Sequence, residues 1–183
     1  GLGLTFDADV VLGQKTGYFL DQRDNRALIG TYAEDCRVLD MFANTGGFSV
    51  HAAAGGAREV VAVDSSAPAL AAANRNMAHN LTRKEVVSCA FRTETGDAFE
   101  VIDRYTRKGE RFEIVIVDPP SFTPRQTSVE KALQSYEMLA ERAVKPVRPD
   151  GLLLLASCSS RVTADEFHLT VSHAAARVCL LYT

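Results

Sequence analysis

The chain has 183 residues, of which 46% are hydrophobic and 23% are charged, and its formal net charge is −3. This length and composition suit one globular domain with a buried core. The slight acidity gives no overall attraction to nucleic acid or to an anionic membrane surface. The four cysteines show neither a CxxC pair nor a metal-ligand spacing. We therefore expect a cytoplasmic protein with no metal, no signal peptide and no membrane span.

The first 35 residues differ from the rest of the chain. We expect a small hairpin over Leu2–Leu12 with a reversal near Asp7–Asp9, followed by a charged helix over Asp21–Ala33 that Asp21 caps. We interpret residues 1–35 as an N-terminal extension that packs on a domain formed by residues 36–183.

From Cys36 onward, short β-rich runs alternate with helical stretches. The expected strands cover Cys36–Phe42, Glu59–Asp64, Val86–Arg92, Phe112–Asp118, Gly151–Ser157 and Arg177–Tyr182. The expected helices cover Gly46–Gly55, Ala67–Asn80, Phe99–Arg107, Ser128–Val144 and Ala164–Ala176. Ser65 or Ser66 can cap the second of these helices, and Pro68 suits its first turn. The alternation predicts an α/β fold with a doubly wound, mostly parallel sheet.

Two apolar runs end abruptly in polar residues: Ile114–Phe122 reads IVIVDPPSF, and Leu152–Ser159 reads LLLLASCS. Such runs are typical of strands that are buried on both faces of a parallel sheet. In open α/β sheets, ligands bind just beyond the carboxyl ends of the strands. Asp118 and Cys158 should therefore project into one crevice. An acid followed by two prolines, beside a cysteine, indicates chemistry on a planar nucleobase.

Three acids at expected strand ends indicate a cofactor site. Asp40 precedes a glycine turn, Asp64 is spaced to bond a ribose diol, and Asp97 can accept from an adenine amino group. The turn lacks the GxGxxG pattern of dinucleotide sites, and Asp40 would repel a pyrophosphate. S-adenosylmethionine carries a sulfonium and an ammonium but no phosphate, so it suits this set of acids. The alternative is that each acid is a simple cap or turn residue.

The glycine turn, Asp64, GDAF (Gly96–Phe99) and DPPSF (Asp118–Phe122) resemble motifs of class I S-adenosylmethionine-dependent methyltransferases, which have a Rossmann-like fold. KTGYFLDQRDNR (Lys15–Arg26) resembles the segment that precedes the catalytic fold in bacterial 23S rRNA methyltransferases of the large-subunit methyltransferase I type. Those enzymes make 5-methylcytosine. The similarity runs from about Leu4 to Phe167.

Members of that family also carry an N-terminal PUA RNA-binding domain and a C-terminal strand pair, neither of which we find in this sequence. The resemblance therefore implies a fragment that contains the catalytic domain. We expect it to bind rRNA mainly through the missing N-terminal domain. A homodimer is one of the oligomeric states that the sequence leaves open.

The resemblance implies a role for each residue of the cofactor site. Residues expected at the methionine end are Asp40, Phe42, Thr45 and Gly46; those at the ribose are Asp64 and Ser65; those at the adenine are Asp97 and Ala98; Asp118 and Pro119 complete the cofactor set. Lys15, Gln22 and Arg23 are expected to close over the site, with Arg23 available to the methionine carboxylate. The alternative for Arg23 is an ion pair on the helix surface with Asp21 or Asp24.

The resemblance also bears on the reaction. Carbon 5 of cytosine takes a methyl group only after a thiolate has added to carbon 6, and Cys158 matches the family's cysteine at the end of the fifth strand. Asp118 is expected to bond the cytosine edge, with Pro120, Phe122 and Lys15 also at the substrate and Phe122 stacked on the base. Many related enzymes carry a second cysteine where this chain has Ser121, so the base that removes the carbon 5 proton is open.

The other cysteines, Cys36, Cys89 and Cys179, lie in or beside strand-like runs, and we expect them to be small buried groups. Two other functions stay open. DPP followed by an aromatic also marks enzymes that methylate a nitrogen of guanine or adenine in RNA, although Ser157-Cys158-Ser159 favours cytosine. The second is a non-catalytic module that binds a nucleotide or RNA. The glycine pattern disfavours an NAD-dependent reductase.

Overall fold

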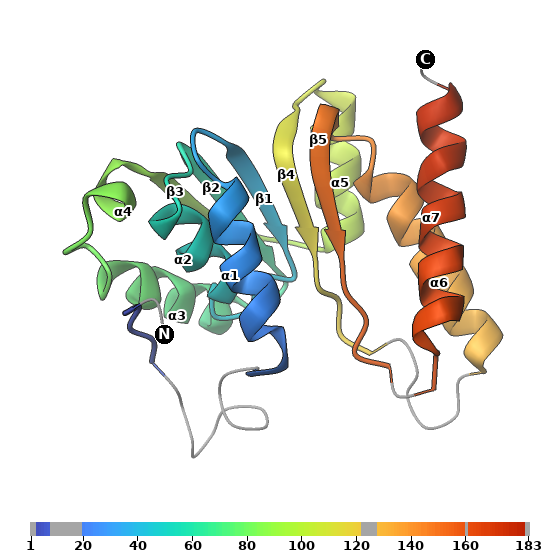
Figure 1. Ribbon diagram of the computed structural model, residues 1–183, viewed down its shortest axis with the longest axis horizontal. Coiled ribbons are helices and arrows are strands. Elements are labelled where there is room, and N and C mark those ends of the chain that lie inside the picture. The colour runs from blue at the N-terminus through green and yellow to red at the C-terminus, as the bar shows by residue number, and fades with distance from the viewer. Residues whose placement is uncertain (1–2, 8–19, 122–127, 160, 182–183) are drawn as a thin grey trace. The chain divides into compact units, whose positions relative to one another are not determined.

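The computed structural model describes residues 3–7, 20–121, 128–159 and 161–181. It divides into two compact units, residues 1–98 and residues 99–183, each with its own strands and helices (Figure 1). Every strand ladder within a unit is parallel. Helices alternate with strands along most of the chain, which confirms the predicted α/β class.

The first unit contains three parallel strands, β1 (Arg37–Met41), β2 (Glu59–Asp64) and β3 (Ala90–Thr95), with β2 in the middle. The register between them is unbroken, so that Glu59 lies opposite Arg37 on one side and Ala90 on the other. The inner positions of β1 and β2 are buried. Their β-branched and aliphatic side chains are those expected for strands covered on both faces.

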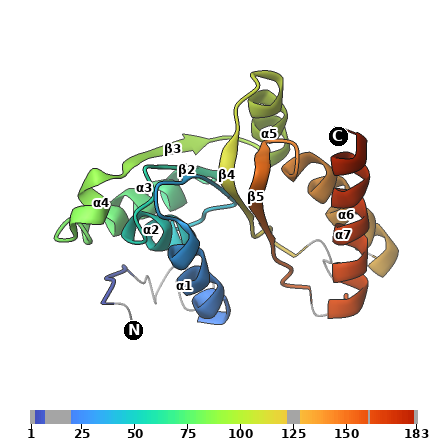
Figure 2. The same ribbon diagram turned by 45° about the horizontal axis from the view of Figure 1, so that its top comes forward.

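The helices of the first unit are α1 (Arg23–Tyr32), α2 (Gly47–Ala54), α3 (Ala67–Ala78) and the short α4 (Lys84–Ser88). Both views show α1, α2 and α3 on one side of the three strands (Figures 1 and 2). Helix α2 packs on β1 and β2, and α3 packs on β2 and β3. Ser66 caps α3 by accepting a 3.3 Å hydrogen bond from the Ala69 amide, and Pro68 lies in the first turn, as predicted.

The second unit contains two parallel strands, β4 (Phe112–Val117) and β5 (Val147–Leu155). Its helices are α5 (Ala98–Arg107), α6 (Val129–Ala143) and α7 (Ala164–Leu181). The ladder is irregular near its start, because Phe112 lies opposite Val147 whereas Ile114 lies opposite Leu152. The extra residues of β5 turn through Asp150, whose φ is 61°.

Helices α6 and α7 pack along each other in both views (Figures 1 and 2). Their shared core contains Ala132, Tyr136, Ala140, Val162, Val171 and Ala174. The rings of Tyr136 and Phe167 meet edge to face, with centroids 5.0 Å apart. Arg177 of α7 forms ion pairs with Glu137 and Glu141 of α6. The two helices are therefore held together by apolar and ionic contacts.

Two strand predictions were wrong. Arg177–Leu181, expected as part of a last strand, continues α7, where Arg177 forms its ion pairs with α6. Val86–Ser88 belong to α4, and β3 begins only at Ala90. In both places a short run of β-branched and aliphatic residues fits a helix turn as well as a strand. Strand β5 also begins four residues earlier than the predicted Gly151, at Val147.

The N-terminal predictions were met in part. The predicted helix is present, but Asp21 does not cap it: Asp21 lies in a 3₁₀ turn (Leu20–Gln22), and Gln22 precedes α1 without a side-chain capping bond. Residues 3–7 form no strand, and the rest of the predicted hairpin lies outside the described residues.

Candidate functional site

A strained turn joins β1 to α2 in the first unit. Phe42, Asn44 and Gly46 have φ angles of 59°, 49° and 77°. Positive φ is uncommon for a residue as large as phenylalanine, and such strain concentrates at functional sites. Gly46 could not be replaced without a shift, because an added Cβ would lie 2.8 Å from the Cβ of Ala73 in α3. The turn therefore packs tightly on α3.

Asp40 lies in β1 just before this turn, and it is 1% exposed. Its Oδ2 accepts a 2.6 Å hydrogen bond from the hydroxyl of Ser49 in α2. A hydrogen bond to an ionised carboxylate is short and strong. Ser49 thus fixes the orientation of the acid.

Gln22, which was predicted to close over the cofactor, is also buried, and its Oε1 accepts a 2.8 Å hydrogen bond from Asn25.

Asp64 connects three segments at the carboxyl end of β2. Its Oδ2 accepts a 2.8 Å hydrogen bond from the amide of Asn44, and its Oδ1 accepts a 2.9 Å bond from the amide of Ser66. Its backbone carbonyl accepts from the amide of Gly96 at 3.0 Å, next to exposed Asp97. A carboxylate has about four lone-pair directions. Asp64 therefore holds the surrounding backbone and keeps acceptor capacity for a ligand.

These groups fit S-adenosylmethionine. Acids at or beyond the ends of β1, β2 and β3 provide acceptors for a ribose diol, an ammonium and an adenine amino group. Ser65, beside Asp64, is exposed, and Ala98, which follows Asp97, is buried. Of the residues predicted for the methionine end, Asp40 lies near the end of β1, and Phe42, Thr45 and Gly46 lie in the turn between β1 and α2.

The second unit brings the other predicted residues together. Ala156, just after β5, donates a 2.9 Å hydrogen bond to the carbonyl of Val117, so the segments after β4 and β5 leave the sheet side by side. The Sγ of Cys158 lies 3.7 Å from the carbonyl oxygen of Pro119. Cys158 is exposed, Asp118 is half-buried and Pro120 is exposed. Cys158 thus lies against the DPP segment.

Tyr136 of α6 is hydrogen-bonded to the segment that carries Cys158. Its hydroxyl accepts a 2.8 Å hydrogen bond from Ser157, whose Oγ in turn accepts from the amide of Ser159 at 3.3 Å. Burial raises the pKa of Tyr136; the bond from Ser157 opposes the rise, and negative charge on Cys158 and on Asp118 adds to it. Tyr136 therefore holds the residue that precedes Cys158 by a side-chain hydrogen bond.

The remaining cysteines differ in their surroundings. Cys89 is half-buried against the apolar cluster of α2 and α3, and this burial raises the pKa of its thiol to about 11. Cys36 is half-buried, and its Sγ lies 3.3 Å from the carbonyl of Tyr32. Cys179 is exposed on α7, so the prediction of a buried thiol was wrong there. This error follows from the mistaken assignment of Arg177–Tyr182 to a strand.

Some predicted contacts lie elsewhere. Arg23 is exposed and forms an ion pair with Asp24 at 3.1 Å, which is the alternative that the sequence left open. Lys15 and Phe122 lie outside the described residues. Sequence reasoning missed Arg26, one helical turn further along α1. It is 5% exposed, and a Cβ added to Gly47 would lie 2.7 Å from its Nε.

Sequence reasoning also missed Asn76, which is fully buried in α3. The available signal was a pair of amides, Asn76 and Asn80, spaced four residues apart on the apolar face of an alanine-rich helix.

No group of three His, Cys, Asp or Glu side chains suited to a metal ion occurs in the described ranges. Within those same ranges, every helix is too short or too polar to cross a bilayer.

Parallel α/β units with acids at strand ends and a strained glycine turn define a Rossmann-like cofactor-binding protein. A family model described as S-adenosylmethionine-dependent methyltransferase matches residues 1–180. The chain belongs to this family, and its cofactor is S-adenosylmethionine.

Curated relatives are similar over nearly the whole chain. A ribosomal RNA large subunit methyltransferase of Deinococcus radiodurans is 43% identical over 175 residues, which are 96% of this chain and 42% of that protein. The ribosomal RNA large subunit methyltransferase I of Tolumonas auensis is 40% identical over 94% of this chain and 43% of that protein. The chain thus spans less than half the length of these relatives.

Solved structures agree with the fold. A candidate methyltransferase crystallised with S-adenosylhomocysteine is 26% identical and has a TM-score of 0.80 over 94% of this chain and 44% of its own. A candidate S-adenosylmethionine-dependent methyltransferase from Streptococcus mutans, also 26% identical, has a TM-score of 0.73 with the same coverage. Both support the Rossmann-like fold and the cofactor.

Proposed function

We propose that this chain is the catalytic part of an rRNA methyltransferase that forms 5-methylcytosine through a covalent bond to Cys158. The observation that carries the proposal is the position of Cys158, exposed and 3.7 Å from the carbonyl of Pro119 in the DPP segment. The names of the curated relatives support ribosomal RNA as the substrate. The cysteine supports cytosine, because methylation of a nitrogen needs no such nucleophile.

The proposed reaction assigns a step to each group. The Cys158 thiolate adds to carbon 6 of the cytosine, and the electron pair of the ring moves to carbon 5. S-adenosylmethionine supplies the electrophilic methyl group, which forms a bond to carbon 5 as its bond to sulfur breaks. A base takes the proton from carbon 5, and the carbon–sulfur bond to Cys158 then breaks to restore the ring. Asp118 is assigned to hold the polar edge of the cytosine in place.

The roles of the cofactor residues are part of the same proposal. Asp64 and Ser65 hold the ribose, Asp97 and Ala98 contact the adenine, and the turn before α2 holds the methionine end. The support is that Asp64 already fixes the amides of Asn44 and Ser66. A site with its donors and acceptors fixed before binding loses little conformational freedom when the ligand arrives.

The test is a mechanism-based trap. The full-length protein is incubated with S-adenosylmethionine and target rRNA that carries 5-fluorocytosine, whose fluorine cannot leave as a proton does. We expect an adduct on Cys158 by peptide mass mapping. Cys158→Ala should abolish methyl transfer and leave affinity for S-adenosylhomocysteine almost unchanged, because the thiol acts only in the chemical step. Cys179→Ala is the matched control, since Cys179 is also exposed in the second unit.

Three results would contradict the proposal in different ways. An active Cys158→Ala protein, or an adduct on Cys179, would exclude this nucleophile. Methylation that maps to a nitrogen of guanine or adenine would favour the alternative reaction that the DPP motif also permits. Cofactor binding without any transfer to rRNA would favour a non-catalytic module.

A further inference from the structure

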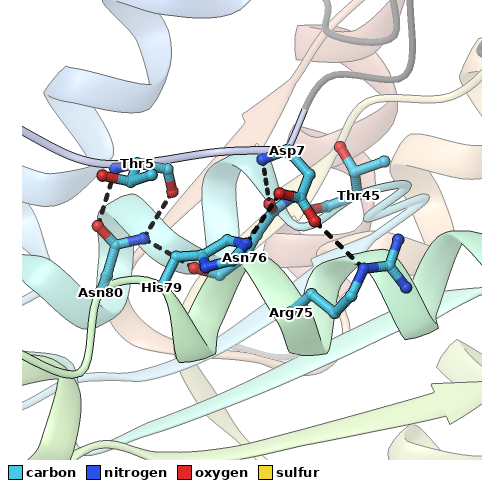
Figure 3. Close-up of polar contacts among 7 residues, drawn as sticks. All are labelled: Thr5, Asp7, Thr45, Arg75, Asn76, His79 and Asn80. Atoms are coloured by element: carbon cyan, nitrogen blue, oxygen red, sulfur yellow. Dashed lines mark hydrogen bonds and ion pairs between the residues drawn. The ribbon is translucent and has the colours of Figure 1, made fainter.

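Residues 3–7, which we call the N-terminal strap, lie along α3 in the first unit (Figure 3). Leu4 and Phe6 pack against a cluster that contains Val50, Ala53 and Met77. Phe6 also stacks on the ring of His51, with centroids 5.7 Å apart. The strap is therefore docked by apolar contacts with α2 and α3, although it forms no strand.

Polar contacts complete the docking. The carboxylate of Asp7 accepts from Arg75 at 3.2 Å and contacts His79 at 2.8 Å (Figure 3). The hydrogen bond with His79, followed by that with Arg75, lowers the pKa of Asp7. Asp7 is therefore ionised at neutral pH, and its charge is matched by α3.

Asn76 connects the strap to the turn between β1 and α2. Its Oδ1 accepts a 2.7 Å hydrogen bond from the amide of Asp7, and its Nδ2 donates a 2.8 Å bond to the carbonyl of Thr45 (Figure 3). The side chain is fully buried. One amide group thus bonds the strap with its oxygen and the turn with its nitrogen.

Asn80 provides a natural comparison one helical turn away. It is also buried, its Oδ1 accepts from the amide of Thr5 at 2.9 Å, and its Nδ2 donates to the carbonyl of Thr5 at 2.8 Å. Its Nδ2 also donates to the backbone of Asn76 at 2.7 Å. In the described part of the chain these bonds reach the strap and α3 but not the turn.

We infer that Asn76 is a positioning residue for cofactor binding, and that it makes the position of the Thr45–Gly46 turn depend on the docked strap. If the strap leaves, the buried Oδ1 of Asn76 loses its partner, which is costly. The amide then reorients toward another donor and releases the Thr45 carbonyl. Through this amide, ordering of the strap and ordering of the turn favour each other. The inference rests on the proposed placement of the methionine end at this turn.

The first experiment compares the two asparagines in the full-length protein. Asn76→Ala and Asn80→Ala should lower the melting temperature to a similar extent, since each removes buried hydrogen bonds. Asn76→Ala should weaken binding of S-adenosylhomocysteine in calorimetry by on the order of five- to ten-fold for one hydrogen bond. Asn80→Ala should weaken it less, because it loosens the strap but keeps the bond to Thr45. In turnover assays, Asn76→Ala should raise KM for S-adenosylmethionine with little change in kcat.

A second experiment measures the unaltered protein first, so that its main result does not depend on whether a variant folds. Coupling between two sites is reciprocal. Saturating S-adenosylhomocysteine should therefore slow hydrogen exchange in the peptide that contains residues 3–7, as measured by mass spectrometry. The slowing should persist in Asn80→Ala and disappear in Asn76→Ala.

The outcomes separate the inference from the function on which it rests. Equal affinity losses in the two variants, or no loss in Asn76→Ala, would exclude a specific role for Asn76 while leaving the cofactor site intact. Unchanged exchange of the strap on ligand binding would exclude the coupling. Failure of the unaltered protein to bind S-adenosylhomocysteine would instead contradict the proposed cofactor site, and the inference with it.

Discussion

The hydroxyl of Ser157 donates a 2.8 Å hydrogen bond to the phenol oxygen of Tyr136. This bond joins the segment after β5 to the middle of α6, and the next residue along the chain is Cys158. Tyr136 is 1% exposed and its ring packs against Phe167. The position of the proposed nucleophile is therefore fixed by a side chain that belongs to the core of α6 and α7.

Tyr136→Phe tests this relationship. The ring and its contact with Phe167 are kept, but the oxygen that accepts from Ser157 is lost. We expect the free energy of unfolding in urea to fall by about 1 kcal/mol, and methyl transfer by the full-length protein to slow because Cys158 is less well held. Ser135→Ala, which removes only a hydroxyl bonded to the backbone of the same helix, is the control. Unchanged kcat in Tyr136→Phe would show that Cys158 does not need this support.

The thiols should differ in reactivity. Exposed Cys158 and Cys179 should react with a thiol reagent at pH 8 in the folded protein, whereas Cys89 should not, because burial raises its pKa to about 11. A raised pKa means that the folded state holds this proton more tightly than the unfolded state. The corresponding stability is present below the unfolded pKa and is lost as the pH rises toward 11.

Mass spectrometry of the labelled peptides measures the order of reaction directly. The accompanying loss of unfolding free energy above the ordinary thiol pKa should be smaller in Cys89→Ala, which has no proton to lose. Rapid labelling of Cys89 at pH 8 would contradict its burial against α2 and α3.

Asp64→Ala should weaken binding of S-adenosylhomocysteine by roughly 1–3 kcal/mol, because it removes the acceptor that we propose for two ribose hydroxyls. It also releases the amides of Asn44 and Ser66, so some loss of stability is expected. Ser66→Ala is the control, since it removes the cap of α3 but leaves the carboxylate. Calorimetry with NAD should show no tight binding. Equal affinity in Asp64→Ala and the unaltered protein would remove Asp64 from the site.

Gly46→Ala and Gly109→Ala separate two effects of glycine. Both residues have positive φ, 77° and 70°, so alanine is strained at either position. That strain costs about 1–2 kcal/mol. At Gly46 the added Cβ also meets Ala73 at 2.8 Å, whereas at Gly109 nothing lies within 4 Å. We expect Gly46→Ala to lower the melting temperature more and, unlike Gly109→Ala, to weaken cofactor binding. Similar effects of both changes would show that the turn can shift away from α3.

With a net charge of −3, these 183 residues should bind rRNA weakly. The logarithm of the association constant should fall with a shallow slope against the logarithm of salt concentration, because few phosphates are neutralised. The full-length protein should give a steeper slope if an RNA-binding domain supplies the additional contacts. A steep slope for the 183 residues alone would contradict this prediction.

Much of the fold was predictable because its signals are local. Strand β2 was predicted with the bounds that the structure has, since a buried parallel strand is a continuous run of β-branched and aliphatic residues. Ser66 and Pro68 marked the start of α3 for similar reasons. The end of α7 was not predictable in this way. Only its packing against α6, with Arg177 facing two glutamates, distinguishes helix from strand there.

The site was predictable to the extent that it depends on strand ends. Asp118 and Cys158 were expected together because the carboxyl ends of adjacent parallel strands meet at one edge. The supporting residues were not expected. Ser49, Tyr136 and Asn76 act through contacts between segments far apart in the sequence, and no local pattern marks such contacts. Whether the cofactor and substrate roles are correct stays a prediction.

Asn76, buried within α3, and Asn80, buried just beyond its end, also bear on how that helix is rotated about its own axis. The buried face of α3 also carries Leu70, Ala73 and Met77, so the apolar pattern already favours one side of the helix. A shift of one residue turns a helix by about 100°, and it would carry Asn76 away from both Thr45 and Asp7. The amide of Asp7 and the carbonyl of Thr45 would then lose this partner, which is unfavourable. The directional bonds of the asparagines thus reinforce the orientation that the apolar side chains of α3 favour.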